Sequence, residues 1–220
     1  MRDRNRFLEP PARSWCKTEA GIDCLIGLSQ PDLPRFFNMG DINQPEHVML
    51  LMAAFSRYPA ALDWARQRTA AAWGPVALES PRFAFVETDY YEPTMGPSIE
   101  KCFWAFERLI DPGRLVEIKL QTNAWEIEYA ERGGHPEPRP LNLDPGYLTP
   151  AKLVLASTKD HAHRLYLSRG IYAEVTLFYK DRQWQHRDWT FPDYRRADYQ
   201  QFFGACRDVL RRRQRKEPQP

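Results

Sequence analysis

The stretch HVMLLMAAF, residues 47–55, is an unbroken apolar run in an otherwise mixed sequence. Runs of this kind are typical of a strand that is buried on both faces of a sheet. The segment YPAALDWARQRTAAAWG follows closely, with Pro59 at a predicted helix start and Gly74 at its end. Leu62 and Trp73 fall on the inward stripe of that helix. A buried strand beside an amphipathic helix predicts a domain in which helices cover a sheet.

The next hundred residues repeat this alternation. RFAFVETDYY (82–91) and KCFWAFERLI (101–110) are predicted strands. DPGRLVEIKLQTNAWEIEYA (111–130) is a predicted helix with Asp111 as its N-cap, and PRPLNLD (138–144) is a further predicted strand. The order β-α-β-β-α-β is that of the ferredoxin-like arrangement, in which two helices cover one face of an antiparallel sheet. We therefore predict an α+β domain with a ferredoxin-like core.

The last third of the chain predicts a sheet extension and a closing helix. AKLVLAS (151–157) is a predicted strand, and residues 196–213 form an amphipathic helix. The segments HRLYL and IYAEVTLFY flank Ser168-Arg169-Gly170, which predicts a hairpin with a three-residue loop. Its register is expected to place Leu165 opposite Ala173 and Leu167 opposite Ile171, with Arg164 opposite Glu174 on the other face. The apolar face of the hairpin is expected to consist of Ile171, Ala173, Val175 and Leu177.

The organisation of the whole chain follows from these elements. Residues 1–38 lack periodicity and are interpreted as a loosely ordered N-terminal arm. Residues 39–213 are predicted to form a single α+β domain, and residues 214–220 a frayed basic and Pro-rich tail. Because the regular pattern begins near Met39, our hypothesis is that translation starts there rather than at Met1.

Composition and charge narrow the class of protein. The chain has 220 residues, 43% of them hydrophobic, and a formal net charge of only +2. It has no run of the roughly 20 apolar residues that a membrane-spanning helix needs, and its first residues lack the apolar core of a secretory signal. We therefore expect a cytoplasmic protein with no membrane partner. Its four cysteines have no C-x-x-C spacing, so neither a zinc ribbon nor a redox motif is indicated.

Known nucleotide and nucleophile motifs are missing from the sequence. It contains no G-x-x-x-x-G-K-[ST], no G-x-G-x-x-G and no G-x-S-x-G. The basic end RRRQRK could contact nucleic acid by charge, but basic residues also complement the C-terminal end of a helix dipole. We do not expect specific nucleic-acid binding, although it remains an alternative.

The segment NLDPGYLTPAKLVLASTKD, residues 142–160, carries more polar chemistry than a core strand needs. Asp144-Pro145-Gly146-Tyr147 is predicted to be a turn, and Asn142 should point the same way as Asp144. Ser157, Thr158 and Lys159 follow the strand, and hydroxyls beside an ammonium group suit a phosphate or carboxylate. A plain Asx-turn explains Asp144 equally well.

Other polar residues join this segment as candidates. Arg164 and Glu174 form either a structural ion pair or a site that binds an anion. Lys119 and Asn123 line one face of the predicted helix, and Asp89 lies near the end of a predicted strand. His161 and His163, with Asp160 beside them, invite a metal. A histidine near an apolar face is more often a core residue, and the sequence names no further ligand. We therefore assign no metal and leave the cofactor unknown.

Several long motifs resemble one family. ETDYYEPTMG, LIDPGRLVEIKLQTN, RPLNLDPGYLTPAKLVLASTKDHAHRLYLSRGIYAEVTLFY and WTFPDYR are similar to the bacterial domain-of-unknown-function family 4416. The resemblance runs from about Met39 to about Leu210. It implies a single cytoplasmic domain of uncharacterised activity, with no reaction, cofactor or catalytic residue to carry over.

Two functional hypotheses follow. The first is a polar cleft that binds or turns over a small anionic or phosphorylated ligand, with Asp144 or Glu174 as the proton-transfer group. Its ligand-binding residues are Asp89, Lys119, Asn123, Asn142, Lys159 and Arg164. The alternative is a module that binds a protein or RNA partner, which exposed Trp184, Trp189 and Tyr194 in one patch would favour. The sequence does not set the oligomeric state or decide whether the protein is an enzyme.

Overall fold

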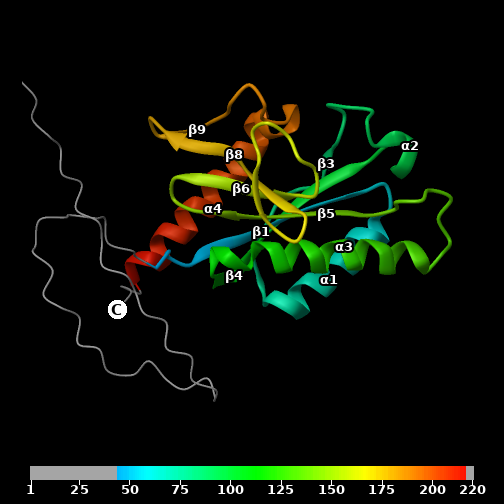
Figure 1. Cartoon of the computed structure of the whole chain (residues 1–220), viewed down its shortest axis with the longest axis horizontal. Helices are drawn as coiled ribbons and strands as arrows, with labels where there is room; N and C mark the ends of the chain where they lie inside the picture. Colours follow the sequence, from blue (N-terminus) through cyan, green and yellow to red (C-terminus); the bar gives the residue numbers. More distant parts are fainter. Residues whose placement is uncertain (1–43, 217–220) are drawn as a thin grey trace, which may run out of the picture. The chain divides into compact units, whose positions relative to one another are not determined.

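The strands form one antiparallel sheet, and helices pack on both of its faces (Figure 1). The computed structural model describes residues 44–216. The predicted N-terminal arm and the predicted translation start at Met39 lie outside these residues, so they stay predictions, as do the predicted domain boundaries. The α+β class is confirmed.

The elements and their bounds are β1 (Val48–Ser56), α1 (Pro59–Trp73), β2 (Val76–Glu79), β3 (Phe83–Ala84), α2 (Glu92–Met95), β4 (Glu100–Ile110), the 3-10 turn η1 (Pro112–Arg114), α3 (Leu115–Glu131), β5 (Asn142–Leu148), β6 (Lys152–Ser157), β7 (Leu165–Ser168), β8 (Ile171–Lys180), β9 (Gln183–Gln185), the 3-10 turn η2 (Pro192–Arg195) and α4 (Ala197–Lys216). The sheet has the order β2-β4-β1-β5-β6-β8-β7, with β3 paired to β4 and β9 paired to β8.

Strand β1 lies at the centre of the core. All nine of its residues are buried, as the apolar run predicted. Alternate side chains, such as Leu50 and Met52, pack against α1 and α3, while Met49 and Leu51 pack against α4 and the segment that contains η2. Figure 1 shows α1 and α3 together on one side of the sheet. Because both faces are covered, β1 carries no polar alternation.

The predicted strand 82–91 was wrong over most of its length. Only Phe83–Ala84 pair with β4, and the chain then leaves the sheet and forms the short helix α2. The edge strand is instead β2, four residues between Pro75 and Pro81, which pairs with β4. The predicted strand fails because the polar residues at 87–89 do not suit a buried face of the sheet. Strand β2 was not predicted because the four residues Val76–Glu79 are too few to show a periodic pattern.

The predicted turn at Asp144-Pro145-Gly146-Tyr147 was also wrong. These four residues lie inside β5, where they pair with Leu50–Ala53 of β1 in an unbroken register. The predicted strand 138–144 therefore starts and ends about four residues later, at Asn142–Leu148. Turn residues are favoured by local backbone preferences, and here the pairing with β1 overrides them.

The hairpin β7–β8 agrees with the predicted register only in part. Leu165 pairs with Ala173, as predicted, but Ser168 pairs with Ile171, so the loop is Arg169-Gly170 alone. Both loop residues have positive φ, which matches the twist of a two-residue hairpin. The predicted apolar face fails at Val175, which is exposed, while Glu174 and Thr176 are buried instead.

The predicted last helix is present as α4 and extends to Lys216. Tyr199, Phe203, Cys206 and Leu210 are its buried stripe. Cys102 and Cys206 are buried free thiols, and burial raises the pKa of Cys102 to about 12. Cys16 and Cys24 lie outside the described residues.

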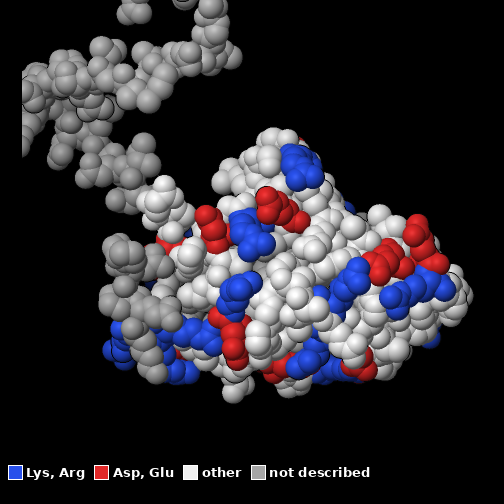
Figure 2. Space-filling model, turned by 90° about the horizontal axis from the view of Figure 1, so that it is seen from below, with Lys and Arg blue, Asp and Glu red and all other residues white. Residues whose placement is uncertain are grey.

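Charges are intermixed on the face that carries α1 and α3. Figure 2 shows that face from below, with acidic and basic side chains side by side. Arg68 and Arg132 both pair with Glu128 there, and Arg66 pairs with Glu79. Such a surface offers no continuous basic track for a phosphate backbone. Within residues 44–216, every helix is too short or too polar to cross a bilayer.

Candidate functional site

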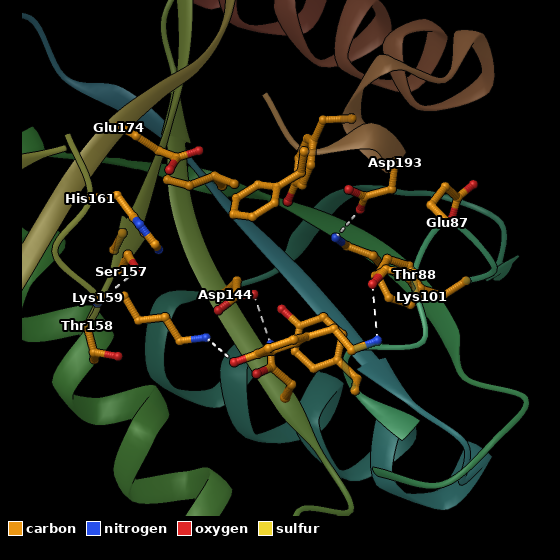
Figure 3. Close-up of a pocket in the computed structure, with 18 of the residues that line it drawn as sticks. Glu87, Thr88, Lys101, Asp144, Ser157, Thr158, Lys159, His161, Glu174 and Asp193 are labelled. Carbon is orange, nitrogen blue, oxygen red and sulfur yellow. Dashed lines mark hydrogen bonds and ion pairs between the residues drawn. The ribbon is translucent and has the colours of Figure 1, made fainter. Parts of the chain in front are cut away.

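A cavity of about 660 Å³ opens where β5 and β6 stop pairing. Its lining comes from β5, the end of β6, the segment 157–161, the segment 85–91, α3 and η2. In Figure 3, Ser157, Thr158 and Lys159 lie on one wall and Thr88, Lys101 and Asp193 on the other. Asp144 lies between the two walls.

The sequence of β5 explains why the sheet separates here. The β5–β6 ladder runs from Leu148–Leu153 to Gly146–Leu155, and Pro145 follows with no N–H to continue it. Gly146 allows a close approach of the two strands, since a Cβ at that position would lie 2.3 Å from the carbonyl oxygen of Val154. The strands are therefore tight at Gly146 and part beyond Pro145, where Asp144 and Asn142 line the cavity.

A network of buried polar groups forms the floor. Lys119 Nζ on α3 donates to Asp144 Oδ1 at 3.0 Å and to the Leu143 carbonyl at 2.9 Å. Asn142 Nδ2 donates to Asp144 Oδ2 at 2.9 Å, and Arg139 donates to Asn142 Oδ1. Arg139 is paired in turn with Glu126 on α3 at 3.0 Å. These contacts fix the β5 carboxylate against the helix.

The charges of this network set the ionisation of Asp144. Burial alone would raise the pKa of its carboxyl, but the nearby ammonium groups of Lys119 and Lys101 and the guanidinium of Arg139 outweigh burial and hold the pKa below its usual value. Burial raises the pKa of Glu126, with Lys119 and Arg139 opposing it. Asp144 is therefore ionised at neutral pH.

The β8 wall is built around a second buried pair. Arg164 Nε donates to Glu174 Oε2 at 2.8 Å, and the two side chains are only 4% and 1% exposed. Thr176 Oγ1 donates to the other carboxylate oxygen of Glu174 at 3.1 Å. Arg164 Nη1 also donates to Ser157 Oγ at 2.7 Å and to the Lys159 carbonyl at 2.9 Å. Arg164 therefore holds the segment after β6 in place.

The opposite wall contains a third buried pair. Lys101 Nζ on β4 lies 2.6 Å from Asp193 Oδ2 on η2, and both side chains are at most 5% exposed. The ammonium group lies 4.4 Å from the centre of the Tyr194 ring and 5.0 Å from that of Phe55. Aromatic faces and a carboxylate together compensate the loss of water around this lysine.

At the mouth, Lys159 reaches across the cavity. Its Nζ donates to the Tyr90 hydroxyl at 2.7 Å and lies 4.6 Å from the centre of that ring (Figure 3). The hydrogen bond from Lys159 and its positive charge lower the pKa of the exposed Tyr90 hydroxyl. Two segments that are far apart in sequence meet here.

Seven of the eight predicted site residues line this one cavity, namely Lys119, Asn123, Asn142, Asp144, Lys159, Arg164 and Glu174. Asp89 does not line it and is exposed. The pairing of Arg164 with Glu174 agrees with the predicted register.

Sequence reasoning missed Lys101, Asp193 and Arg139, which also line the cavity. A lysine within the aromatic run KCFWAF was a usable signal, because a buried lysine needs a partner. Its partner Asp193 lies 92 residues away, and no local pattern links the two.

Within residues 44–216, no group of three or more His, Cys, Asp or Glu side chains is arranged to hold a metal ion. His161 and His163 stack with ring centres 5.8 Å apart, and His163 Nε2 lies 3.2 Å from Glu174 Oε2. The neighbour of His163 is thus a carboxylate that already accepts from Arg164.

Comparison with known proteins gives one match. No curated protein and no solved structure matches the chain. The family described as Domain of unknown function (DUF4416) matches residues 46–209, which is well over half of the chain and includes every residue of the cavity. The chain belongs to the DUF4416 family.

Proposed function

We propose that the cavity binds a small anionic ligand, with Lys159 as the group that attracts the anion. The observation that carries this proposal is the difference between Lys159 and the other cations of the lining. Lys101, Lys119, Arg139 and Arg164 each have a carboxylate partner within 3.0 Å. Among residues 44–216, Lys159 has no such partner and is hydrogen-bonded through Nζ to a phenol.

The surroundings of Lys159 suit an anion. The hydroxyls of Ser157, Thr158 and Tyr90 lie on the same lining, and hydroxyls donate well to carboxylate or phosphate oxygens. A volume of about 660 Å³ is within the usual range for sites of small organic molecules. The paired charges deeper in the cavity would orient such a ligand without repelling it.

Binding is better supported than turnover. Glu174 accepts from Arg164 and Thr176 and is 1% exposed, so it has little freedom to exchange a proton with a ligand. Asp144 is 29% exposed and is the better proton-transfer candidate of the two. Its lowered pKa makes it a weak base, which supports a role in holding ligand groups.

The alternative of a protein- or RNA-binding module has less support. The aromatic patch that would favour it requires Trp184, Trp189 and Tyr194 on the surface together. Trp184 and Tyr194 are buried, and only Trp189 is exposed.

We also propose that β2, β4, β1 and β5, with α1 and α3, form a ferredoxin-like core. The strand order and the antiparallel pairing of each neighbour support this topology. Both helices pack on the same face of β1. An experimental structure in which β1 does not lie between β4 and β5 would contradict it.

The test of anion binding is thermal unfolding of the full chain with inorganic phosphate, phosphate esters and small carboxylates. A ligand at about 100 times its dissociation constant should raise the melting temperature by roughly 5–10 °C. Lys159→Ala should abolish that shift. Lys180→Ala is the matched control, since Lys180 is exposed on β8 and does not line the cavity, and it should keep the shift. The proposal fails if no anion raises the melting temperature, or if both variants respond as the wild type does.

A further inference from the structure

The inner part of the cavity holds a hydrogen-bonding group that the protein itself does not use. The Tyr194 hydroxyl is buried and has no partner among the described residues. Three other buried polar atoms share this state, on His135, Trp184 and Tyr199, but none of those residues lines the cavity. A buried hydroxyl without a partner is costly. Because Tyr194 is one of the residues that line the cavity, a ligand atom bound against this side chain is the partner that we infer for its hydroxyl.

The carboxylates of the same lining have acceptor capacity to spare. An ionised carboxylate offers about four acceptor positions. Asp144 uses its two oxygens for one bond each, to Lys119 and to Asn142. Asp193 accepts from Lys101 through one oxygen. Both residues line the cavity, and Figure 3 shows Asp144 between the two walls, with Asp193 on one of them. Among the groups that donate to carboxylate oxygens, hydroxyls add no charge to the ligand, so they are compatible with an anion that is bound at Lys159.

Aromatic side chains complete the lining between these polar groups. Phe85, Tyr91 and Phe191 line the cavity. Tyr91 packs edge to face against Phe55, Phe85 stacks on Phe55, and the rings of Phe85 and Tyr91 are tilted to each other. The C–H groups of a ligand can pack against an aromatic ring while its hydroxyls form hydrogen bonds with the polar residues of the lining. The lining of the cavity therefore combines the acceptor oxygens of Asp144 and Asp193, the donor hydroxyl of Tyr194 and the apolar surface of the aromatic rings.

We propose that the ligand is the phosphate ester of a small polyol, that is, a sugar phosphate. This rests on the proposed function and adds the chemistry of the rest of the molecule. The phosphate lies at Lys159 with the hydroxyls of Ser157 and Thr158, because its several oxygens accept from all three groups. The polyol extends inward, where its hydroxyls donate to Asp144 and Asp193 and one of its oxygens accepts from Tyr194.

The experiment measures, by calorimetry, the affinity of the full chain for phosphate esters with and without hydroxyls, and glycerol 3-phosphate and propyl phosphate are the pair that differs only in hydroxyls. Ribose 5-phosphate, glucose 6-phosphate and glycerol 3-phosphate are compared with propyl phosphate and inorganic phosphate. At least one polyol phosphate should bind about tenfold or more tightly than propyl phosphate, as one or two added hydrogen bonds allow. Tyr194→Phe should remove most of that preference and leave the affinity for propyl phosphate unchanged.

Tyr199→Phe is the matched control, because Tyr199 also carries a buried hydroxyl without a partner but does not line the cavity. It should keep the preference. Equal binding of all phosphate esters would overturn this inference and leave the proposed anion site standing. A preference that survives Tyr194→Phe would overturn the assignment of the inner wall. Absence of binding by every probe would instead count against the proposed function itself.

Discussion

Strands β1 and β5 lie side by side over seven residue pairs, yet their sequences have little in common. β1 is buried throughout, and all of its residues are apolar apart from Ser56 at its end. β5 reads NLDPGYL and contains a carboxylate, an amide, a proline and a glycine. Four of the seven residues of β5 would be placed in a turn by local preference.

The difference shows two ways to bury a strand. The apolar side chains of β1 are buried against helices on both faces of the sheet, and this burial requires no specific hydrogen-bonding partner. β5 is buried because other elements supply what its polar groups need, above all Lys119 from α3 for Asp144 and for the Leu143 carbonyl. The first way can be read from a short window of sequence, and the second cannot.

The largest expected effect lies in β1. Leu50 is fully buried between the sheet and the helices α1 and α3, so Leu50→Ala should lower the free energy of unfolding by about 2–5 kcal/mol. Urea unfolding measures this change. Ile127→Ala on α3 is the control, because Ile127 is 59% exposed, and it should change stability by less than about 0.5 kcal/mol. Similar losses in both variants would contradict a core centred on β1.

A smaller effect is expected where β5 meets β6. A Cβ at Gly146 would press on the Val154 carbonyl oxygen at 2.3 Å, and backbone cannot give way as a side chain does. Gly146→Ala should therefore cost about 1–3 kcal/mol in urea unfolding. Gly204→Ala has nothing within 4 Å of its new Cβ and lies inside α4, so it should stabilise by about 0.5–1 kcal/mol. If both substitutions changed the free energy of unfolding in the same direction, strands β5 and β6 would be less tightly packed at Gly146 than described.

The smallest expected effect is a change in acid sensitivity. The pKa of Asp144 in the folded protein is below its ordinary value of 3.8, so its charged form stabilises the fold above that pH, and the contribution is lost as the pH falls through the folded pKa. In Asp144→Asn this contribution is missing. The stability difference between wild type and variant should therefore shrink as the pH falls below 3.8.

Urea unfolding at a series of acidic pH values measures that difference. Asp89→Asn is the control, since Asp89 is exposed and outside the cavity, and its acid profile should match the wild type. A constant gap between wild type and Asp144→Asn at all acidic pH values would contradict the pairing of Asp144 with the cations around it.

Seven residues of the cavity lining could be named from the sequence, because their polar side chains break the apolar patterns around them. Ser157-Thr158-Lys159 and Arg164 with Glu174 were readable as local departures from strand chemistry. Lys101, Asp193 and Arg139 were not, since each gains its meaning from a partner on another element. The hairpin shows the same limit. Its local pairing at Leu165–Ala173 was predictable, but the buried Glu174 and exposed Val175 reflect the cavity wall and not a period of two.

By itself, the sequence determined the α+β class, the buried strand at 47–55, the amphipathic helices and the family. These depend on apolar periodicity and on caps such as Asp111, whose carboxylate accepts from the Gly113 amide as its position predicts. Tertiary structure alone decided that 142–148 is a strand, that β5 and β6 part beyond Gly146, and which charges meet in the cavity. The physical reason is that burial of charged and turn-forming residues becomes favourable only when distant partners such as Lys119 compensate them, and no short window of sequence contains those partners.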